Sequence, residues 1–286
     1  MRYERPDTIQ DATALLASAE ANSFVLAGGT DLLVRMQNDE FEADLILDIK
    51  SIPGMDAVSQ NDEGFVIGAA VPAAALSEHA ALASAWPGVV EAANLIGSTQ
   101  IQGRCTMVGN LCNASPAADS VPALVAAGAR VRVAGPAGAR DVAIIDIPTG
   151  PGKTSLQKGE IVEAVLLPHP APRSGDAYLR FIPRTEMDIA VIGVGVYLAL
   201  DEAGIVSSAR IALGAVGPKV VLADEAAAAI IGTRLEQKAL DALAAACSAA
   251  SQPIDDKRGT VAFRKKVAGV LARRAATAAY ARAGGK

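Results

Sequence analysis

Aromatic residues are scarce in this chain, and their scarcity narrows the range of binding partners. They make up 3% of the 286 residues, as one tryptophan, four tyrosines and five phenylalanines. Proteins that bind single-stranded nucleic acid stack bases on aromatic side chains, so we expect no such surface here. The 26 basic and 31 acidic residues give a formal net charge of −5, which also argues against a DNA- or RNA-binding surface.

Cysteine and histidine are rare as well, and this limits metal chemistry. The three cysteines, Cys105, Cys112 and Cys247, form no C-x-x-C pair. Unaided, they ligate neither an iron–sulfur cluster nor a structural zinc ion. The two histidines, His79 and His169, are expected at the surface rather than in catalysis. We therefore predict no metal site and no catalytic residue.

Long apolar runs are missing too. Charge-free apolar stretches such as residues 189–200 are too short to span a bilayer. The first residues show no apolar signal region, and an odd number of cysteines fits a reducing compartment. We expect a cytoplasmic protein without a transmembrane segment.

The chain does contain a regular succession of strand and helix patterns, enough for two or three domains. Residues 1 to about 55 show a β-α-β-type pattern, with strands at 23–26 and 45–49 and a helix between them. The next part predicts strands at 65–67, 131–133, 142–147 and 161–167 and helices around 73–79 and 89–96. From residue 122 the pattern indicates another helix or a buried turn. Residues 97–116 are rich in Gly, Ser, Thr and Asn and are expected to form a long functional loop.

Prolines between residues 168 and 176 indicate a domain boundary. Beyond it, three strand patterns at 177–181, 189–200 and 206–216 predict an antiparallel sheet, and helices are expected at 225–231 and 238–250. A terminal helix carries an apolar stripe of Phe263, Val267, Val270 and Leu271. Its basic residues, Arg264 among them, are placed on the other faces, which are either solvated or dock a partner.

These patterns together predict an α+β fold. A two-subdomain N-terminal domain spans 1–175, with subdomains of about 1–55 and 56–175. A C-terminal domain with a small antiparallel sheet and helices follows at 176–286.

The first segment that points to chemistry is Ala-Gly-Gly-Thr-Asp at residues 27–31, directly after a strand. A glycine pair lets the backbone approach a ligand closely and aim its N–H groups at phosphate. Alone, such a pair is most often a turn. Its spacing also differs from the G-x-G-x-x-G pattern of Rossmann dinucleotide sites.

The second segment runs from residue 106 to residue 122. Thr106 and Asn110 offer side-chain hydrogen bonds, and Gly109 permits close approach. Asp119 is an acid among small residues that can accept hydrogen bonds from ribose hydroxyls. Two loops of small residues suit a long ligand with a pyrophosphate at its centre.

Together these segments resemble the FAD-binding medium subunit of the molybdenum hydroxylases, the family of carbon monoxide dehydrogenase and xanthine dehydrogenase. Residues 27–31 are similar to the family's first flavin loop, and Thr-Met-Val-Gly-Asn at 106–110 is similar to its second, usually Thr-Ile-Gly-Gly-Asn. Residues 114–116, 184–190, 214–218 and 258–275 extend the resemblance over nearly the whole chain.

The resemblance implies an FAD-binding domain of the PCMH type and a set of flavin-binding residues. The set comprises Leu26, Ala27, Gly28, Gly29, Thr30, Asp31, Leu32, Ile96, Thr106, Val108, Gly109, Asn110, Ser115, Asp119, Ile161, Val162 and Arg180.

One departure from the family pattern lies in the second loop, where Val108 replaces the usual glycine. A β-branched residue resists positive φ and blocks close approach. Either the loop is extended at Val108 or flavin binding is weakened.

The resemblance also implies a division of labour among subunits. This chain would pass electrons through FAD to an external acceptor. The molybdenum cofactor would lie on a large partner and the [2Fe-2S] clusters on a small one, in a dimer of heterotrimers. Two alternatives stay open: a flavin-free structural subunit, motivated by Val108, and a self-contained FAD-dependent reductase.

Overall fold

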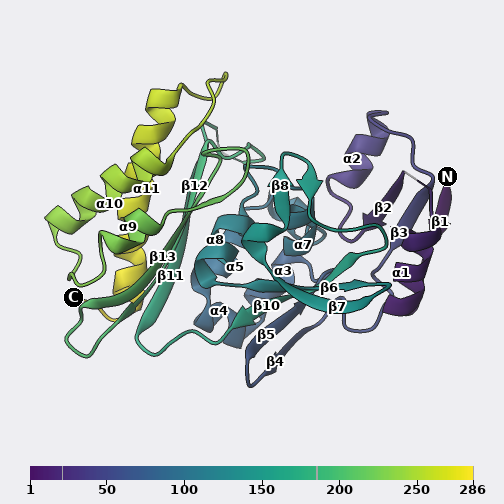
Figure 1. Ribbon diagram of the computed structural model, residues 1–286, viewed down its shortest axis with the longest axis horizontal. Coiled ribbons are helices and arrows are strands. Elements are labelled where there is room, and N and C mark those ends of the chain that lie inside the picture. The colour runs from purple at the N-terminus through teal and green to yellow at the C-terminus, as the bar shows by residue number, and fades with distance from the viewer. Residues whose placement is uncertain (21, 185, 286) are drawn as a thin grey trace.

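The computed structural model describes residues 1–20, 22–184 and 186–285. Figure 1 shows three units side by side, with the N-terminus at one end of the molecule and the C-terminal helices at the other. Within the described residues, no helix combines the length and apolar character needed to cross a bilayer.

The first unit is a small parallel sheet with two helices. Its strands are β1 (Arg2–Glu4), β2 (Ser23–Leu26) and β3 (Leu45–Asp48), in the order β1-β3-β2. Its helices are α1 (Ile9–Ser18) and α2 (Leu32–Gln37). Thr8 caps α1, since its side chain accepts from the Asp11 N–H. The predicted β-α-β pattern is confirmed by the parallel pairing of β2 with β3.

The central unit is built on a five-stranded antiparallel sheet of order β4-β5-β10-β6-β7. Its strands are β4 (Val58–Asn61), β5 (Gly64–Gly68), β6 (Arg130–Gly135), β7 (Gly138–Ala143) and β10 (Ile161–Pro168), with a hairpin of β8 (Pro148–Gly150) and β9 (Lys153–Thr154). Its helices are α3 (Ala73–Glu78), α4 (Ala80–Ala85), α5 (Pro87–Ala93), α6 (Thr99–Gln102), α7 (Met107–Cys112) and α8 (Ser120–Ala127).

Two predictions for the central unit are wrong. Residues 97–116 are not a long loop, because they contain the helices α6 and α7. Residues 142–147 are not a single strand, because β7 ends at Ala143 and a short 3₁₀ turn, Ile144–Asp146, follows. Buried Ile144 and Ile147 explain the apolar run that imitates a strand.

The C-terminal unit is an antiparallel sheet covered by helices. The strands β11 (Ser174–Phe181), β12 (Ile192–Leu200) and β13 (Val206–Gly214) confirm the predicted three, and a short β14 (Val221–Leu222) extends the sheet. The helices α9 (Asp224–Ala228), α10 (Gln237–Ala250) and α11 (Val261–Arg282) pack on one side of this sheet (Figure 1). Helix α8 of the central unit contacts β12 and β13.

The terminal helix α11 corrects one detail of the predicted apolar stripe. Phe263 and Val270 are exposed, and the buried face consists largely of alanines such as Ala272 and Ala276. Arg264, predicted on a polar face, is buried and donates to the Val191 carbonyl (2.8 Å) and to Asp256 (2.6 Å). The small alanines let the helix lie close to the sheet. Arg264 can be buried beside them because its guanidinium is hydrogen-bonded to Val191 and Asp256.

Candidate functional site

A cavity of about 630 Å³ lies between the first and central units. Its walls come from residues 23–35, from residues 105–113 and from residues 152–162, with Ile49 and Ile96 added. The two sequence segments predicted to bind a ligand therefore face one cavity, although about eighty residues separate them.

Strand β2 leads directly into the first loop, residues 27–31, which lies at the wall of this cavity. Gly28 packs against the chain that leads into the second loop, because a Cβ at Gly28 would lie 2.0 Å from the Arg104 carbonyl oxygen. Gly29 has φ of +76°, a left-handed conformation that glycine adopts without strain. The glycine pair thus serves loop-to-loop packing and the turn itself.

The first loop presents a run of unused backbone donors. Among the described residues, none accepts a hydrogen bond from the N–H groups of Gly28, Gly29, Thr30 and Asp31. Successive free N–H groups in a turn form a concave site for an anion. This feature fits a phosphate or pyrophosphate group.

A polar network of Lys50, Asp48 and Tyr3, which sequence reasoning did not predict, fixes the first loop. Lys50 donates to the Ala27 carbonyl (3.2 Å) and forms an ion pair with Asp48 (2.8 Å). Tyr3 donates to the other Asp48 oxygen (2.5 Å). Burial alone would raise the pKa of Asp48, but the hydrogen bonds from Lys50 and Tyr3 lower it overall. Asp48 therefore stays ionised and fixes Lys50 on the loop.

The second loop is the N-terminal turn of helix α7. Thr106 is the N-cap, and its hydroxyl accepts from the Gly109 N–H (2.9 Å). The N–H groups of Met107 and Val108 have no acceptor among the described residues. Val108 lines the cavity, so this wall also offers a donor. Val108 is helical, so the first of the two alternatives for this position, an extended conformation, is wrong. A β-branched residue is compatible with helical φ.

Thirteen of the predicted flavin-binding residues line the cavity: Ala27, Gly28, Gly29, Thr30, Asp31, Leu32, Ile96, Thr106, Val108, Gly109, Asn110, Ile161 and Val162. Leu26, Ser115, Asp119 and Arg180 are not among its lining residues. Leu26 is buried, and Ser115 accepts from the Ala117 N–H (3.2 Å).

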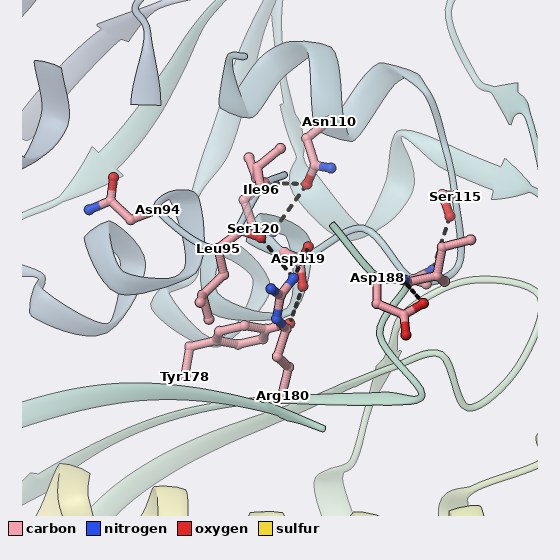
Figure 2. Close-up of polar contacts among 12 residues, drawn as sticks. Asn94, Leu95, Ile96, Asn110, Ser115, Asp119, Ser120, Tyr178, Arg180 and Asp188 are labelled. Atoms are coloured by element: carbon pink, nitrogen blue, oxygen red, sulfur yellow. Dashed lines mark hydrogen bonds and ion pairs between the residues drawn. The ribbon is translucent and has the colours of Figure 1, made fainter. Parts of the chain in front are cut away.

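Asp119 and Arg180 instead form a buried ion pair. Nη1 of Arg180 lies 2.9 Å from Oδ2 of Asp119, and Tyr178 donates to Oδ1 (3.2 Å; Figure 2). Burial raises the pKa of Asp119 to about 6, while Arg180 and Tyr178 oppose that rise. Each carboxylate oxygen of Asp119 therefore accepts a hydrogen bond from the C-terminal sheet.

Other lining residues were missed by sequence reasoning. Phe24 and Arg35 lie at the cavity, as does the segment 152–160. Glu160 is held there by Arg140 (2.8 Å) and by the Gln157 N–H (2.8 Å). No motif marks these residues, and only the strand signal that begins at Ile161 lies near them in the sequence.

The ionisable groups at the cavity give no sign of acid–base or thiol chemistry. Burial raises the pKa of Cys105 to about 11 and that of Cys112 to about 12, so both thiols stay protonated near neutral pH. Partial enclosure raises the pKa of Asp31, and the charge of Arg35 opposes the rise. In the part of the chain that the structure describes, no cluster of His, Cys, Asp and Glu could hold a metal ion.

The cavity fits a dinucleotide in size and chemistry. Its volume lies within the range of about 300–1,000 Å³ that is common for cofactor sites. Free N–H groups on both loops match a pyrophosphate, and Ile96, Ile161 and Val162 give apolar surface for a ring system. FAD has both kinds of group.

Comparison with known proteins agrees with this chemistry. Residues 1–170 match the family described as "FAD binding domain in molybdopterin dehydrogenase", and residues 177–279 match "CO dehydrogenase flavoprotein C-terminal domain". The carbon monoxide dehydrogenase medium chain of Afipia carboxidovorans is 34% identical over 98% of this chain and 97% of its own length. A putative xanthine dehydrogenase FAD-binding subunit of Escherichia coli is 30% identical over 99% and 97%.

A solved structure extends the agreement to three dimensions. Reconstituted CO dehydrogenase from Oligotropha carboxidovorans superposes with a TM-score of 0.93 at 34% identity, over 98% of this chain and 97% of the matched chain. Together with the two facing loops, these matches show that the chain belongs to the family of FAD-binding oxidoreductase subunits of the molybdenum hydroxylases.

Proposed function

We propose that this chain is the electron-transfer subunit of a multi-subunit molybdenum hydroxylase, passing electrons from partner [2Fe-2S] clusters through FAD to an external acceptor. The observation that carries the proposal is the pair of facing loops with free N–H groups in one cavity of about 630 Å³. Family membership identifies the cofactor as FAD, since the domain matched over residues 1–170 is an FAD-binding domain.

In this proposal the chain's own groups bind and orient the cofactor. The free N–H groups of residues 28–31 and of Val108 would hold the pyrophosphate. Lys50 keeps the first loop in place, and Thr106 keeps the second. FAD, when bound, accepts single electrons and gives up pairs, so it links one-electron donors to a two-electron acceptor. No side chain of this subunit needs to act as an acid or base.

The partners follow from the same reasoning. A large subunit would hold the molybdenum cofactor and a small subunit the iron–sulfur clusters, in a dimer of heterotrimers in the cytoplasm. Two features support this division: no metal-binding cluster occurs among the described residues, and the relatives include a dehydrogenase medium chain. We also propose domain limits of 1–175 and 176–286, with subdomains divided near residue 55.

Flavin content tests the first half of the proposal. The purified chain is denatured, and the released cofactor is identified and quantified against protein. We expect FAD at about one equivalent per chain. A colourless protein that also fails to take up added FAD would point to the flavin-free structural alternative, and release of FMN would also contradict the proposal.

Reconstitution tests the electron-transfer half. The partner subunits are added to this chain separately and together, and flavin bleaching is followed anaerobically after substrate is added. We expect bleaching only when all subunits are present. Bleaching by substrate with this chain alone would favour the self-contained reductase.

A further inference from the structure

A buried carboxylate lies at the junction between the C-terminal sheet and the central unit. Strand β11 contacts both helix α5 of the central unit and the terminal helix α11 (Figure 1). Asp176 is on β11 and is only 4% exposed. Its Oδ2 accepts a hydrogen bond from the Val89 N–H (2.9 Å) in the first turn of α5. Gly88 permits this approach, because a Cβ at that position would lie 2.6 Å from Oδ2.

The second oxygen of this carboxylate has no partner. Oδ1 of Asp176 is buried, and no described residue forms a hydrogen bond with it. A buried carboxylate with an unpaired oxygen is costly when it is ionised. Burial raises the pKa of Asp176 to about 6, and the N–H groups of Gly88 and Val89 oppose the rise. The protonated form is therefore favoured more strongly here than in the unfolded chain.

The polar groups that face Asp176 from neighbouring elements do not supply the missing hydrogen bond. Glu91 on α5 raises the pKa of Asp176 further, and the charge of Arg282 on α11 lowers it. The guanidinium of Arg282 donates to the main-chain carbonyl of Asp176 (2.8 Å) and forms an ion pair with Glu91. On β12, Tyr197 is paired with Asp176 in register, and its hydroxyl accepts from the Ala171 N–H (3.2 Å).

We propose that Asp176 is a proton-binding group that controls how tightly the C-terminal domain docks on the central unit. When it is ionised, the junction holds a buried negative charge with one unpaired oxygen. A proton on Oδ1 removes that charge and leaves Oδ2 free to accept from Val89. The junction is therefore tighter in mild acid than at neutral pH. The proposal is independent of FAD, because Asp176 does not line the flavin cavity.

The direction of the pH dependence follows from proton binding. The pKa of Asp176 is about 6 in the folded chain, against an ordinary value of 3.8. Between these two values the folded chain binds more protons than the unfolded chain, so the stability that Asp176 contributes falls as the pH rises. Each step of one in pKa is a factor of ten in the equilibrium constant, so ionisation raises the unfolding constant about 100-fold in all.

The only tryptophan of the chain lies at this junction and can report on it. Trp86 directly precedes α5 and is 1% exposed. Its ring lies beside that of Tyr197 on β12, with the centroids 5.4 Å apart, and its Nε1 donates to the Pro168 carbonyl (2.8 Å). Looser packing of α5 on the C-terminal sheet therefore changes the surroundings of the indole.

The first experiment follows Trp86 fluorescence of the purified full-length chain between about pH 8 and about pH 5. We expect a reversible transition near pH 6 in the wild type and none in Asp176→Asn, whose amide is neutral at every pH. Glu91→Gln is the matched control, since Glu91 is an acid of the same junction with a side chain that is 45% exposed. This variant should keep the transition, with a lower midpoint, because the charge of Glu91 raises the pKa of Asp176.

Thermal unfolding gives a second measurement. At pH 8 Asp176→Asn should melt several degrees above the wild type, and the difference should shrink as the pH is lowered to about 5. A variant that melts below the wild type at pH 8 would overturn the proposal, because the ionised carboxylate would then stabilise the junction. A fluorescence transition that persists in Asp176→Asn would overturn it as well, since another group would be responsible. The wild type alone also tests the proposal, which fails if Trp86 shows no transition between pH 8 and pH 5.

Discussion

The two loops that face each other across the cavity contain similar residues, yet their glycines have different roles. In the first loop, a Cβ on Gly28 would meet the Arg104 carbonyl oxygen at 2.0 Å, and Gly29 needs a φ of +76°. In the second loop, Gly109 lies inside helix α7, where a Cβ would meet only the Thr106 hydroxyl at 2.9 Å. Chain packing requires glycine in the first loop, whereas the helix of the second tolerates side chains.

This difference explains why one loop keeps its glycine pair and the other does not. Val108 occupies a helical position where its side chain is buried. The departure from the family pattern therefore does not disturb the backbone that carries the free N–H groups. The first loop has no such freedom, because it packs against residues 104–105, which lead into the second loop.

The largest effect is expected from Gly28→Ala. The new methyl group would overlap a backbone carbonyl, which cannot move aside as a flexible side chain can. We expect a loss of about 3 kcal/mol in the free energy of unfolding, at the upper end of typical overpacking costs. Urea denaturation measures the loss, and FAD binding should disappear with it. Stability close to wild type would show that the two loops do not pack as described.

Val108→Gly should lower the free energy of unfolding somewhat less than Gly28→Ala does. The change removes a buried side chain and places a flexible residue in a helix, so we expect a loss of about 2 kcal/mol in stability. FAD affinity should not rise, because the helical backbone at this position needs no glycine. Tighter binding, measured by flavin fluorescence titration, would show that the methyl groups of Val108 obstruct the cofactor.

Gly29→Ala tests the turn rather than the packing. A left-handed conformation costs a non-glycine residue about 1–2 kcal/mol, and we expect a loss of that size in the free energy of unfolding. Asparagine tolerates this conformation better than alanine, so Gly29→Asn is the matched control. Gly29→Asn should therefore lose less stability than Gly29→Ala. Equal losses would point to steric contact with Leu26 and Leu33 instead.

Much of the fold around these loops could be predicted from local pattern. The apolar runs at 23–26 and 161–167 predicted β2 and β10 correctly, because buried strands need little more than such a run. Helix α7 could not be found in this way. It is six residues long and contains glycine and asparagine, so its stability comes from the Thr106 cap and from packing rather than from propensity.

Side chains with distant partners were the main source of error. Arg264 was assigned to a solvated face because its acceptors, Val191 and Asp256, come together with it only in the folded chain. The ion pair of Asp119 with Arg180 was not predicted for the same reason, since Arg180 lies 61 residues away. A charged residue shows its chemistry in the sequence, but its partner depends on tertiary contacts.

Gly109→Ala should have the smallest effect on stability and gives the sharpest contrast with Gly28→Ala. Replacing a helical glycine by alanine gains about 0.5–1 kcal/mol, and crowding of the Thr106 hydroxyl offsets part of that gain. We therefore expect the free energy of unfolding of the apoprotein to stay within about 1 kcal/mol of wild type. FAD affinity should nevertheless fall several-fold, because Gly109 lines the cavity and the added methyl group reduces the space for the cofactor. Urea denaturation of the apoprotein and fluorescence titration with FAD measure the two quantities separately. If the same substitution lowers stability as much at Gly109 as at Gly28, the two loops depend on glycine in the same way, and the distinction between packing and binding does not hold.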